Sequence, residues 1–165
     1  MIDPKEDSLS QFADWYLNSG DIKRIYAPHN DPLLFIDGVS GVVLYRRDNF
    51  QVELFICEPN VDIPVHTHPN VDSFELFLCG MEFTHNGKHA IDHEQSLEEI
   101  DGMPRYAYTT IRVKPNDPHG ALSSKNGGSF LSIQHWLNGE PPTHVSSDWA
   151  GKKFMGESHK KQTGL

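Results

Sequence analysis

Apolar positions follow two different periods along this chain, a helical one near the N-terminus and an alternating one further on. Near the N-terminus they recur at the three- and four-residue spacing of one helical face. They are Leu9, Phe12, Trp15 and Tyr16. Ser8 or Ser10 can cap this segment, and Asn18-Ser19-Gly20 ends it. The pattern therefore predicts a helix over residues 8–19 whose aromatic face packs against the rest of the domain.

From Ile22 onward, short runs of β-branched and aromatic residues alternate with turn residues. Asn86-Gly87 is a strong signal for a two-residue hairpin, because both central positions of a type I′ turn need positive φ. Many short strands at this spacing predict an all-β sandwich or barrel. The expected strands are Leu33–Ile36, Gly41–Arg46, Phe50–Glu58, Val65–His68, Phe74–Cys79, Met81–His85, His89–Asp92, Arg112–Lys114 and Ser129–Trp136.

The 165 residues fit a single domain, with no repeat or linker that would divide it. We expect the barrel over residues 30–140. After Pro141-Pro142 the sequence becomes polar and rich in Gly and Lys. Residues 141–165 are therefore expected to form an extended C-terminal arm, with Trp149 and Phe154 as its docking points.

Charge and cysteine content exclude several classes of partner. The formal net charge of −9 and the pI near 5.5 argue against nucleic acid or an anionic membrane, since both need a basic surface. Two cysteines, Cys57 and Cys79, make no disulfide framework, which is typical of a reducing, cytoplasmic setting. No signal peptide or membrane span is evident. We expect a cytoplasmic protein whose partner is a small molecule.

The candidate chemistry lies in three histidines. In Pro64-Val65-His66-Thr67-His68-Pro69 two imidazoles project from one face of an extended strand, roughly 6.5–7 Å apart. His119 follows a second proline-rich turn. Three neutral imidazoles on strands leave coordination positions open, which is the arrangement of a catalytic metal site. We expect His66 and His68 to point inward near the barrel mouth and His119 to enter from a strand lying opposite.

These two segments resemble the two motifs of the cupins. The first cupin motif places a His-x-His and a later glutamate between two glycines, and here Asn60 and Gly80 bracket His66-Thr67-His68. The second ends in Pro-Gly-x-Pro-His, which Pro115-Asn116-Asp117-Pro118-His119 matches. In both, asparagine replaces a family glycine; it is the residue next most tolerant of left-handed backbone. The resemblance covers about residues 40–137 and implies a cupin-type double-stranded β-helix, a jelly-roll barrel.

The sequence departs from the cupin pattern where that family carries its metal-binding glutamate. Counting back from Gly80, this position is Ser73. Glu75 lies two residues further on and faces the same side, whereas Asp72 faces the other side unless a bulge shifts the register. Ser123 stands where cupins usually have an asparagine. We expect His66, His68, His119 and Glu75 as metal ligands, with Glu75 as a ligand or an acid/base group and Asp72 as the weaker alternative.

Strand alternation also predicts the pocket around this site. Ser73 and Phe77 share the inward side with Glu75, as does Cys79, which is expected to be a small core residue. On the later strand, Gln134 and Trp136 are expected inside and His135 outside. His85 and His89 flank the hairpin tip, where exposure is the default. The resulting pocket set is Ser73, Phe77, Gln134 and Trp136.

The donor set suits Fe(II), with Mn(II), Ni(II) or Zn(II) as competitors. Three histidines without the usual carboxylate also resemble the thiol dioxygenases, although in Ser132-Ile133-Gln134-His135-Trp136 only the serine of their Ser-x-His-x-Tyr run is kept. The leading hypothesis is an Fe(II)-dependent dioxygenase. A metal-dependent lyase, decarboxylase or isomerase would use the same residues with Glu75 transferring a proton. A non-catalytic ligand-binding module and a purely structural barrel are further alternatives, and a homodimer is plausible.

Overall fold

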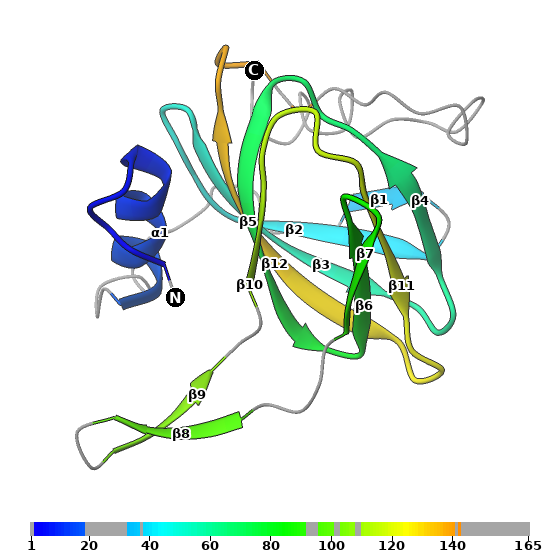
Figure 1. The fold of residues 1–165 in the computed structure, drawn as a ribbon. Helices are drawn as coiled ribbons and strands as arrows, with labels where there is room; N and C mark the ends of the chain where they lie inside the picture. Colours follow the sequence, from blue (N-terminus) through cyan, green and yellow to red (C-terminus); the bar gives the residue numbers. More distant parts are fainter. Residues whose placement is uncertain are drawn as a thin grey trace.

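The computed structural model describes residues 2–18, 33–36, 38–91, 96–100, 103–107, 110–140 and 142. Within these residues one helix precedes a series of antiparallel strands, so the predicted all-β fold with an N-terminal helix is confirmed (Figure 1). The elements are α1 (Ser8–Asn18), β1 (Leu33–Ile36), β2 (Val39–Arg47), β3 (Phe50–Cys57), β4 (Asp62–His66), β5 (Val71–Cys79), β6 (Met81–His85), β7 (Lys88–Ile91), β8 (Ser96–Ile100), β9 (Met103–Ala107), β10 (Thr110–Val113), β11 (His119–Ser123) and β12 (Gly128–Trp136).

Two sheets enclose the interior. The larger has the strand order β1-β2-β3-β12-β5-β10, and the smaller has the order β4-β11-β6-β7. Figure 1 shows them as the two walls of one barrel. Neighbours in each sheet come from distant parts of the chain, as β12 does between β3 and β5. Strands β8 and β9 pair only with each other within the described part of the chain.

Strands β2, β3, β5 and β12 of the larger sheet carry two apolar faces. The inner face and the smaller sheet share one core cluster: Val39, Phe55, Cys57, Phe77, Met81, Phe83, Ala121 and Phe130. The outer face shares a second cluster with the helix: Leu9, Ala13, Tyr16, Tyr45, Val52, Phe74, Leu76, Leu131 and Ile133. Where α1 covers its outer face, the larger sheet is buried on both sides, which explains the apolar runs of β5 and β12.

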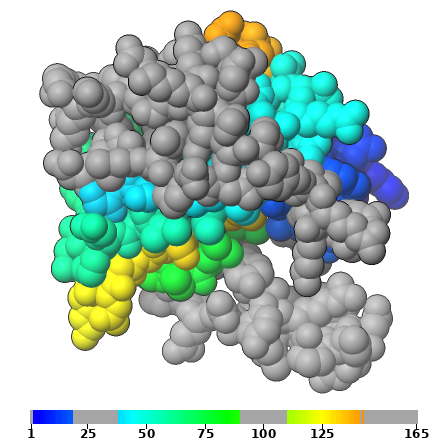
Figure 2. Space-filling view, turned by 180° about the vertical axis from the view of Figure 1, so that it is seen from behind, coloured from blue at the N-terminus to red at the C-terminus, as the bar shows by residue number. Residues whose placement is uncertain are grey.

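The helix is held at both its start and its aromatic face. Asp7, rather than Ser8 or Ser10, is the N-cap, since its carboxylate accepts a hydrogen bond of 2.9 Å from the Ser10 N–H. Phe12 lies 4.5 Å from Phe50, ring centroid to centroid, and Figure 2 shows α1 against this side of the barrel. Trp15 stays 42% exposed, so the predicted aromatic face is only partly buried. The helix ends at Asn18.

Several strand boundaries differ from the predicted ones. Strand β4 begins at Asp62 and ends at His66, so His68 lies just beyond it instead of within a strand. Strands β8 and β9 were not among the expected strands, and β11 was expected only as the strand that carries His119, without bounds. For β8 and β9 a local signal exists, since Asp101-Gly102, a dipeptide typical of hairpin turns, stands between them in the sequence. Trp149 and Phe154 of the predicted arm lie outside the described residues.

Both asparagines that replace a cupin glycine adopt the left-handed backbone that the replacement implies. Asn60 has φ of 58° and Asn116 has φ of 67°. Asn86 of the predicted hairpin also has positive φ, and β6 and β7 pair across it as expected. These three turns confirm that asparagine supplies the geometry for which glycine is otherwise used.

Candidate metal centre

The three predicted histidines meet in one place. Strands β4 and β11 are direct neighbours, with His66 paired to His119, so the third histidine enters beside the first and not from the opposite wall. His68 reaches the same point from the turn after β4. The nitrogens that each residue offers to an ion all lie within 4.8 Å of one another, and among the described residues this is the group of His, Cys, Asp and Glu that could hold a metal.

The geometry of the nitrogens fits one ion. His66 Nε2 and His68 Nε2 are 3.1 Å apart. Two nitrogens bound at about 2.1 Å, at right angles around one metal, stand about 3.0 Å apart. Gly120 lets β11 approach β4 closely at this point, since a Cβ there would lie 2.8 Å from the Ile63 carbonyl oxygen. His66 and His68 thus have the separation that one ion needs, and Gly120 lets the strand that carries His119 lie close to them.

Backbone carbonyls orient two of the imidazoles. His66 Nδ1 donates to the Pro64 carbonyl at 2.6 Å, and His119 Nδ1 donates to the Asp117 carbonyl at 2.9 Å. A carbonyl only accepts, so in each ring the proton sits on Nδ1 and the lone pair is on Nε2, as a ligand requires. Burial lowers the pKa of His119, which keeps this ring neutral at physiological pH.

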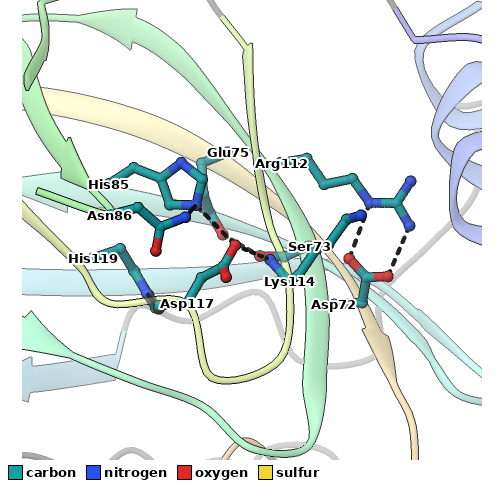
Figure 3. A network of polar contacts seen from close by, with 9 residues as sticks. All are labelled: Asp72, Ser73, Glu75, His85, Asn86, Arg112, Lys114, Asp117 and His119. Atoms are coloured by element: carbon teal, nitrogen blue, oxygen red, sulfur yellow. Dashed lines mark hydrogen bonds and ion pairs between the residues drawn. The ribbon is translucent and has the colours of Figure 1, made fainter. Parts of the chain in front are cut away.

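Asp117 and His85 support this arrangement from outside the histidine group. The Asp117 carboxylate lies 2.9 Å from His85 Nε2 and accepts a hydrogen bond of 3.0 Å from the Lys114 N–H (Figure 3). This holds the loop whose carbonyl orients His119. His85 is half-buried, not exposed as its hairpin position suggested. Sequence reasoning missed Asp117 as a functional residue; its place two residues before a ligand histidine was the available signal.

A cavity of about 70 Å³ lies beside the three histidines. By volume it holds about five water molecules, so a ligand inside it is small. One wall is polar and comes from β5 and β12: Ser73, Glu75, Ser132 and Gln134. The remaining walls are largely apolar: Val39, Phe55, Ile63, Val71, Phe83, Gly120, Ala121, Phe130 and Pro142. The lining contains no Lys or Arg among the described residues.

Glu75 lines this cavity but is not part of the histidine group. Its Oε1 accepts hydrogen bonds from Ser73 Oγ at 2.7 Å and from Ser132 Oγ at 2.9 Å. Its Oε2 is buried and has no hydrogen-bond partner among the described residues. Burial raises the pKa of Glu75 to about 7, and the charge of Glu53 adds to the rise, although the two serines oppose it. The geometry thus favours an acid/base group over a ligand.

The other candidate carboxylate points away from the cavity. Asp72 lies on the outer face of β5 and binds Arg112 through two hydrogen bonds, of 3.1 and 2.7 Å. Figure 3 shows this pair on the opposite side of β5 from His119 and Asp117. Alternation on the strand is regular here, and no bulge turns Asp72 inward. Asp72 is therefore excluded as a ligand in this arrangement.

Of the four expected pocket residues, Ser73 and Gln134 line the cavity, whereas Phe77 and Trp136 do not. Both of the latter face inward and are fully buried, Phe77 in the apolar core and Trp136 beneath the guanidinium of Arg46. Strand alternation predicts whether a side chain faces inward, but it does not predict how far along the barrel the side chain lies. His135 faces outward and stacks on Phe50.

Cys79 is exposed and not a core residue. The pairing of β12 with β5 shifts register between Ser129 and Phe130, so one extra residue of β5 lies between Phe77 and Cys79 in the ladder. The bulge turns Cys79 to the outside and ends the inward set at Phe77. Ser123, which stands at the usual asparagine position, instead donates to the Glu58 carbonyl and ties down the loop after β3.

No family model and no curated protein sequence matches this chain. Among solved structures, KdgF from a Halomonas species aligns with a TM-score of 0.50 at 10% identity, covering 64% of this chain and 84% of that one. A chain from the crystal structures of the DMSP lyases RdDddP and RnDddQII gives 0.51 at 14% identity, covering 73% and 64%. An RmlC-like cupin from Shewanella frigidimarina gives 0.49 at 12% identity, covering 73% and 88%. At such identities the likeness concerns the fold.

Proposed function

We propose that this chain, which has the double-stranded β-helix fold of the cupins, is a metal-dependent enzyme that acts on a small molecule by proton transfer. The reaction class is that of a lyase, decarboxylase or isomerase. His66, His68 and His119 hold the metal, and Glu75 is the general acid and base. One of the structural neighbours is described as a DMSP lyase, so lyase chemistry occurs on this fold, but at 14% identity the substrate does not transfer.

A single observation supports proton transfer most strongly. Glu75 is a buried carboxyl group beside the metal-binding histidines, and one of its oxygens has no hydrogen-bond partner among the described residues. A carboxyl with a pKa of about 7 is present in both protonation states at neutral pH, which is the condition for efficient acid and base catalysis. A purely structural carboxyl in a barrel interior would be expected to have both oxygens satisfied.

The residues that line the cavity have different roles on its different sides. A divalent ion held by the histidines would supply Lewis-acid chemistry, polarising an oxygen of the bound molecule. The apolar wall, with Phe55, Phe83 and Phe130, excludes water and lowers the local dielectric. Ser73 and Ser132 fix Oε1 of Glu75, which leaves Oε2 to take a proton from the ligand or to return one. Gln134 offers a polar contact beside it.

Metal analysis tests the first half of this proposal. Protein purified without chelator is expected to bind one divalent ion per chain, measured by elemental analysis after reconstitution with Fe(II), Mn(II), Ni(II) or Zn(II). His66→Ala and His119→Ala are expected to lower the metal affinity at least about 100-fold, because each removes a direct ligand. His89→Ala is the matched control, since that histidine is exposed on β7. Full metal content in both ligand variants would rule out the site.

A second function, an Fe(II)-dependent dioxygenase, is favoured by a different observation. The ligand group contains three imidazoles and no carboxylate, and most of the cavity wall outside β5 and β12 is apolar, which suits a site that admits O₂ next to a small substrate. Oxygen consumption with Fe(II) during turnover would select this function. Turnover under anaerobic conditions with Mn(II) or Zn(II) would select proton transfer. Stoichiometric metal without turnover on broad substrate panels would select a binding module.

A further inference from the structure

A chain of hydrogen bonds on the inner face of β12 ends at Glu75. Trp136 Nε1 donates to Gln134 Oε1 at 2.8 Å, and Gln134 Nε2 donates to Ser132 Oγ at 3.1 Å. Ser132 Oγ then donates to Glu75 Oε1 at 2.9 Å. The residues alternate along one strand and all are buried, so the chain runs inside the barrel wall from Trp136 to the cavity.

The direction of this chain is set at its far end. An indole N–H is a donor only, so the Gln134 amide must turn its oxygen toward Trp136. Its nitrogen then faces Ser132, and the serine hydroxyl, which accepts from that nitrogen, has its proton directed at Glu75. Reversing either of the first two bonds would leave two donors facing each other, and reversing the last would leave the Ser132 proton without an acceptor in this series of bonds. The chain therefore has a single consistent orientation, and the donor-only group decides it.

Strand register places this series of hydrogen bonds next to Glu75. Ser132 is paired with Glu53 of β3 on one side and with Glu75 of β5 on the other. Gln134 is paired with Gln51 and Ser73 in the same way. The middle strand therefore carries one donor to Glu75, Ser132. The second donor, Ser73, comes from β5 itself and donates to the same oxygen.

We propose that Trp136 is a positioning residue for Glu75: its indole N–H orients Gln134 and Ser132 so that Oε1 is always an acceptor and the mobile proton is confined to Oε2. This rests on the proposed role of Glu75 as acid and base. It assigns a function to a tryptophan that is not among the residues lining the cavity. Without the indole N–H, the Gln134 amide can rotate and Ser132 can turn its proton away from Glu75.

Other charged groups near Glu75 must stay unchanged in a test. Glu53 lies one strand beyond Ser132, and the three histidines lie across the cavity. Strand β10 presents Ile111 opposite Glu75, while the neighbouring Arg112 is turned outward to Asp72. Substitutions at Trp136 and Gln134 change none of these charges, so they isolate the hydrogen-bond chain.

The test is infrared titration of the metal-free full chain, with the carboxyl band of Glu75 assigned by its loss in Glu75→Gln. In Trp136→Phe the protonated C=O band is expected to move to higher wavenumber, because Oε1 loses a donor. The titration midpoint is expected to rise by on the order of half a unit to one unit, since the charged form loses the same hydrogen bond. Gln134→Met removes the hydrogen bond between Gln134 and Ser132, one step closer to Glu75. It is expected to shift the band position and the titration midpoint in the same direction as Trp136→Phe. The same variant tests the proposal if Trp136→Phe fails to fold.

Arg46→Lys is the matched control. It disturbs the packing over the Trp136 ring, from which the guanidinium carbon lies 3.8 Å, but keeps the indole N–H and the charge. An unchanged band in Trp136→Phe, or an equal shift in Arg46→Lys, would overturn the role of Trp136 and leave the proposed function standing. Full turnover in Glu75→Gln would overturn the proposed function and leave the infrared result standing.

Discussion

Asp72 and Glu75 lie three positions apart on strand β5, and the sheet places their carboxylates in opposite surroundings. On the outer face, Asp72 pairs with Arg112, which also lies 2.6 Å from Asp7 at the start of the helix. On the inner face, Glu75 accepts hydrogen bonds from two serine hydroxyls and forms no ion pair with a cation of the described residues. The difference shows that one strand can use the same chemical group for attachment on one side and for proton transfer on the other, depending only on what the neighbouring element supplies.

Removing the inner carboxyl is expected to have the largest effect. Glu75→Gln keeps the shape and the serine contacts but cannot exchange a proton, so kcat should fall about 10²–10⁴-fold with metal content unchanged. The measurement is steady-state kinetics on the substrate found in the anaerobic screen, with metal analysis alongside. Asp72→Asn, on the outer face of the same strand, is the control and should retain its kcat. An equal loss of kcat in Glu75→Gln and Asp72→Asn would contradict the assignment of proton transfer to the inner face alone.

The second-largest effect is expected in the pH dependence of the unfolding free energy, to which the inner carboxyl of Glu75 contributes. The pKa of Glu75 is raised from 4.5 to about 7 in the folded state. The folded protein therefore holds this proton more tightly than the unfolded chain, so its stabilising contribution is complete below pH 4.5 and is lost as the pH rises through 7. About 2.5 pKa units correspond to about 3 kcal/mol. Relative to the parent protein, Glu75→Gln should thus gain about 3 kcal/mol of unfolding free energy between about pH 4 and about pH 8, measured by denaturant titration. A constant difference across this range would contradict it.

Breaking the outer cluster should cost stability and leave the metal site intact. Arg112 is mostly buried and pairs with Asp72, Asp7 and Glu6. Asp72 and then Asp7 hold the pKa of the guanidinium above its usual value, although burial opposes them. Arg112→Ala leaves three carboxylates together without their cation, so the free energy of unfolding should fall by about 2 kcal/mol.

Arg112→Lys, which keeps the charge but loses the two-pronged contact with Asp72, should be intermediate. Calorimetry or chemical denaturation gives the stability, and metal titration of the same samples gives the affinity. A loss of metal affinity in Arg112→Ala larger than twofold would mean that the two faces of β5 are coupled.

The smallest effect should come from the support of His119. Asp117→Ala removes the carboxylate that holds His85 and the Lys114 N–H, so the loop whose carbonyl orients His119 becomes less well fixed. Metal affinity should fall about tenfold, as for other groups that orient a ligand without binding the metal. Asp62→Ala removes an exposed carboxylate from β4 and is the control. An unchanged affinity in Asp117→Ala would show that the backbone alone holds His119.

Local patterns in the sequence carried much of the fold and the centre of the site. Alternation predicted most strands, asparagines at Asn60 and Asn116 predicted left-handed turns, and the His-x-His spacing predicted that His66 and His68 share a face. These features depend on a few neighbouring residues and on backbone geometry, which a sequence displays directly. That His119 joins His66 and His68 was implied by its place in the second motif that resembles the cupins. Where prediction failed, as at Cys79, a bulge in the pairing of β5 with β12 had changed the parity.

What the sequence by itself determined is therefore the strand pattern and the two local histidine motifs, because both follow from short-range spacing. The barrel and the convergence of the two motifs were predicted through the resemblance to the cupins. Only the tertiary structure decided the surroundings of Glu75. Ser132 and Glu53 are far from it in the chain, and the pairing of β3, β12 and β5 brings them into one row. Register between distant strands depends on the packing of the whole barrel, which no local pattern encodes. The same packing placed Asp72 against the helix, and so divided one strand into a charged outer face and a buried acid within.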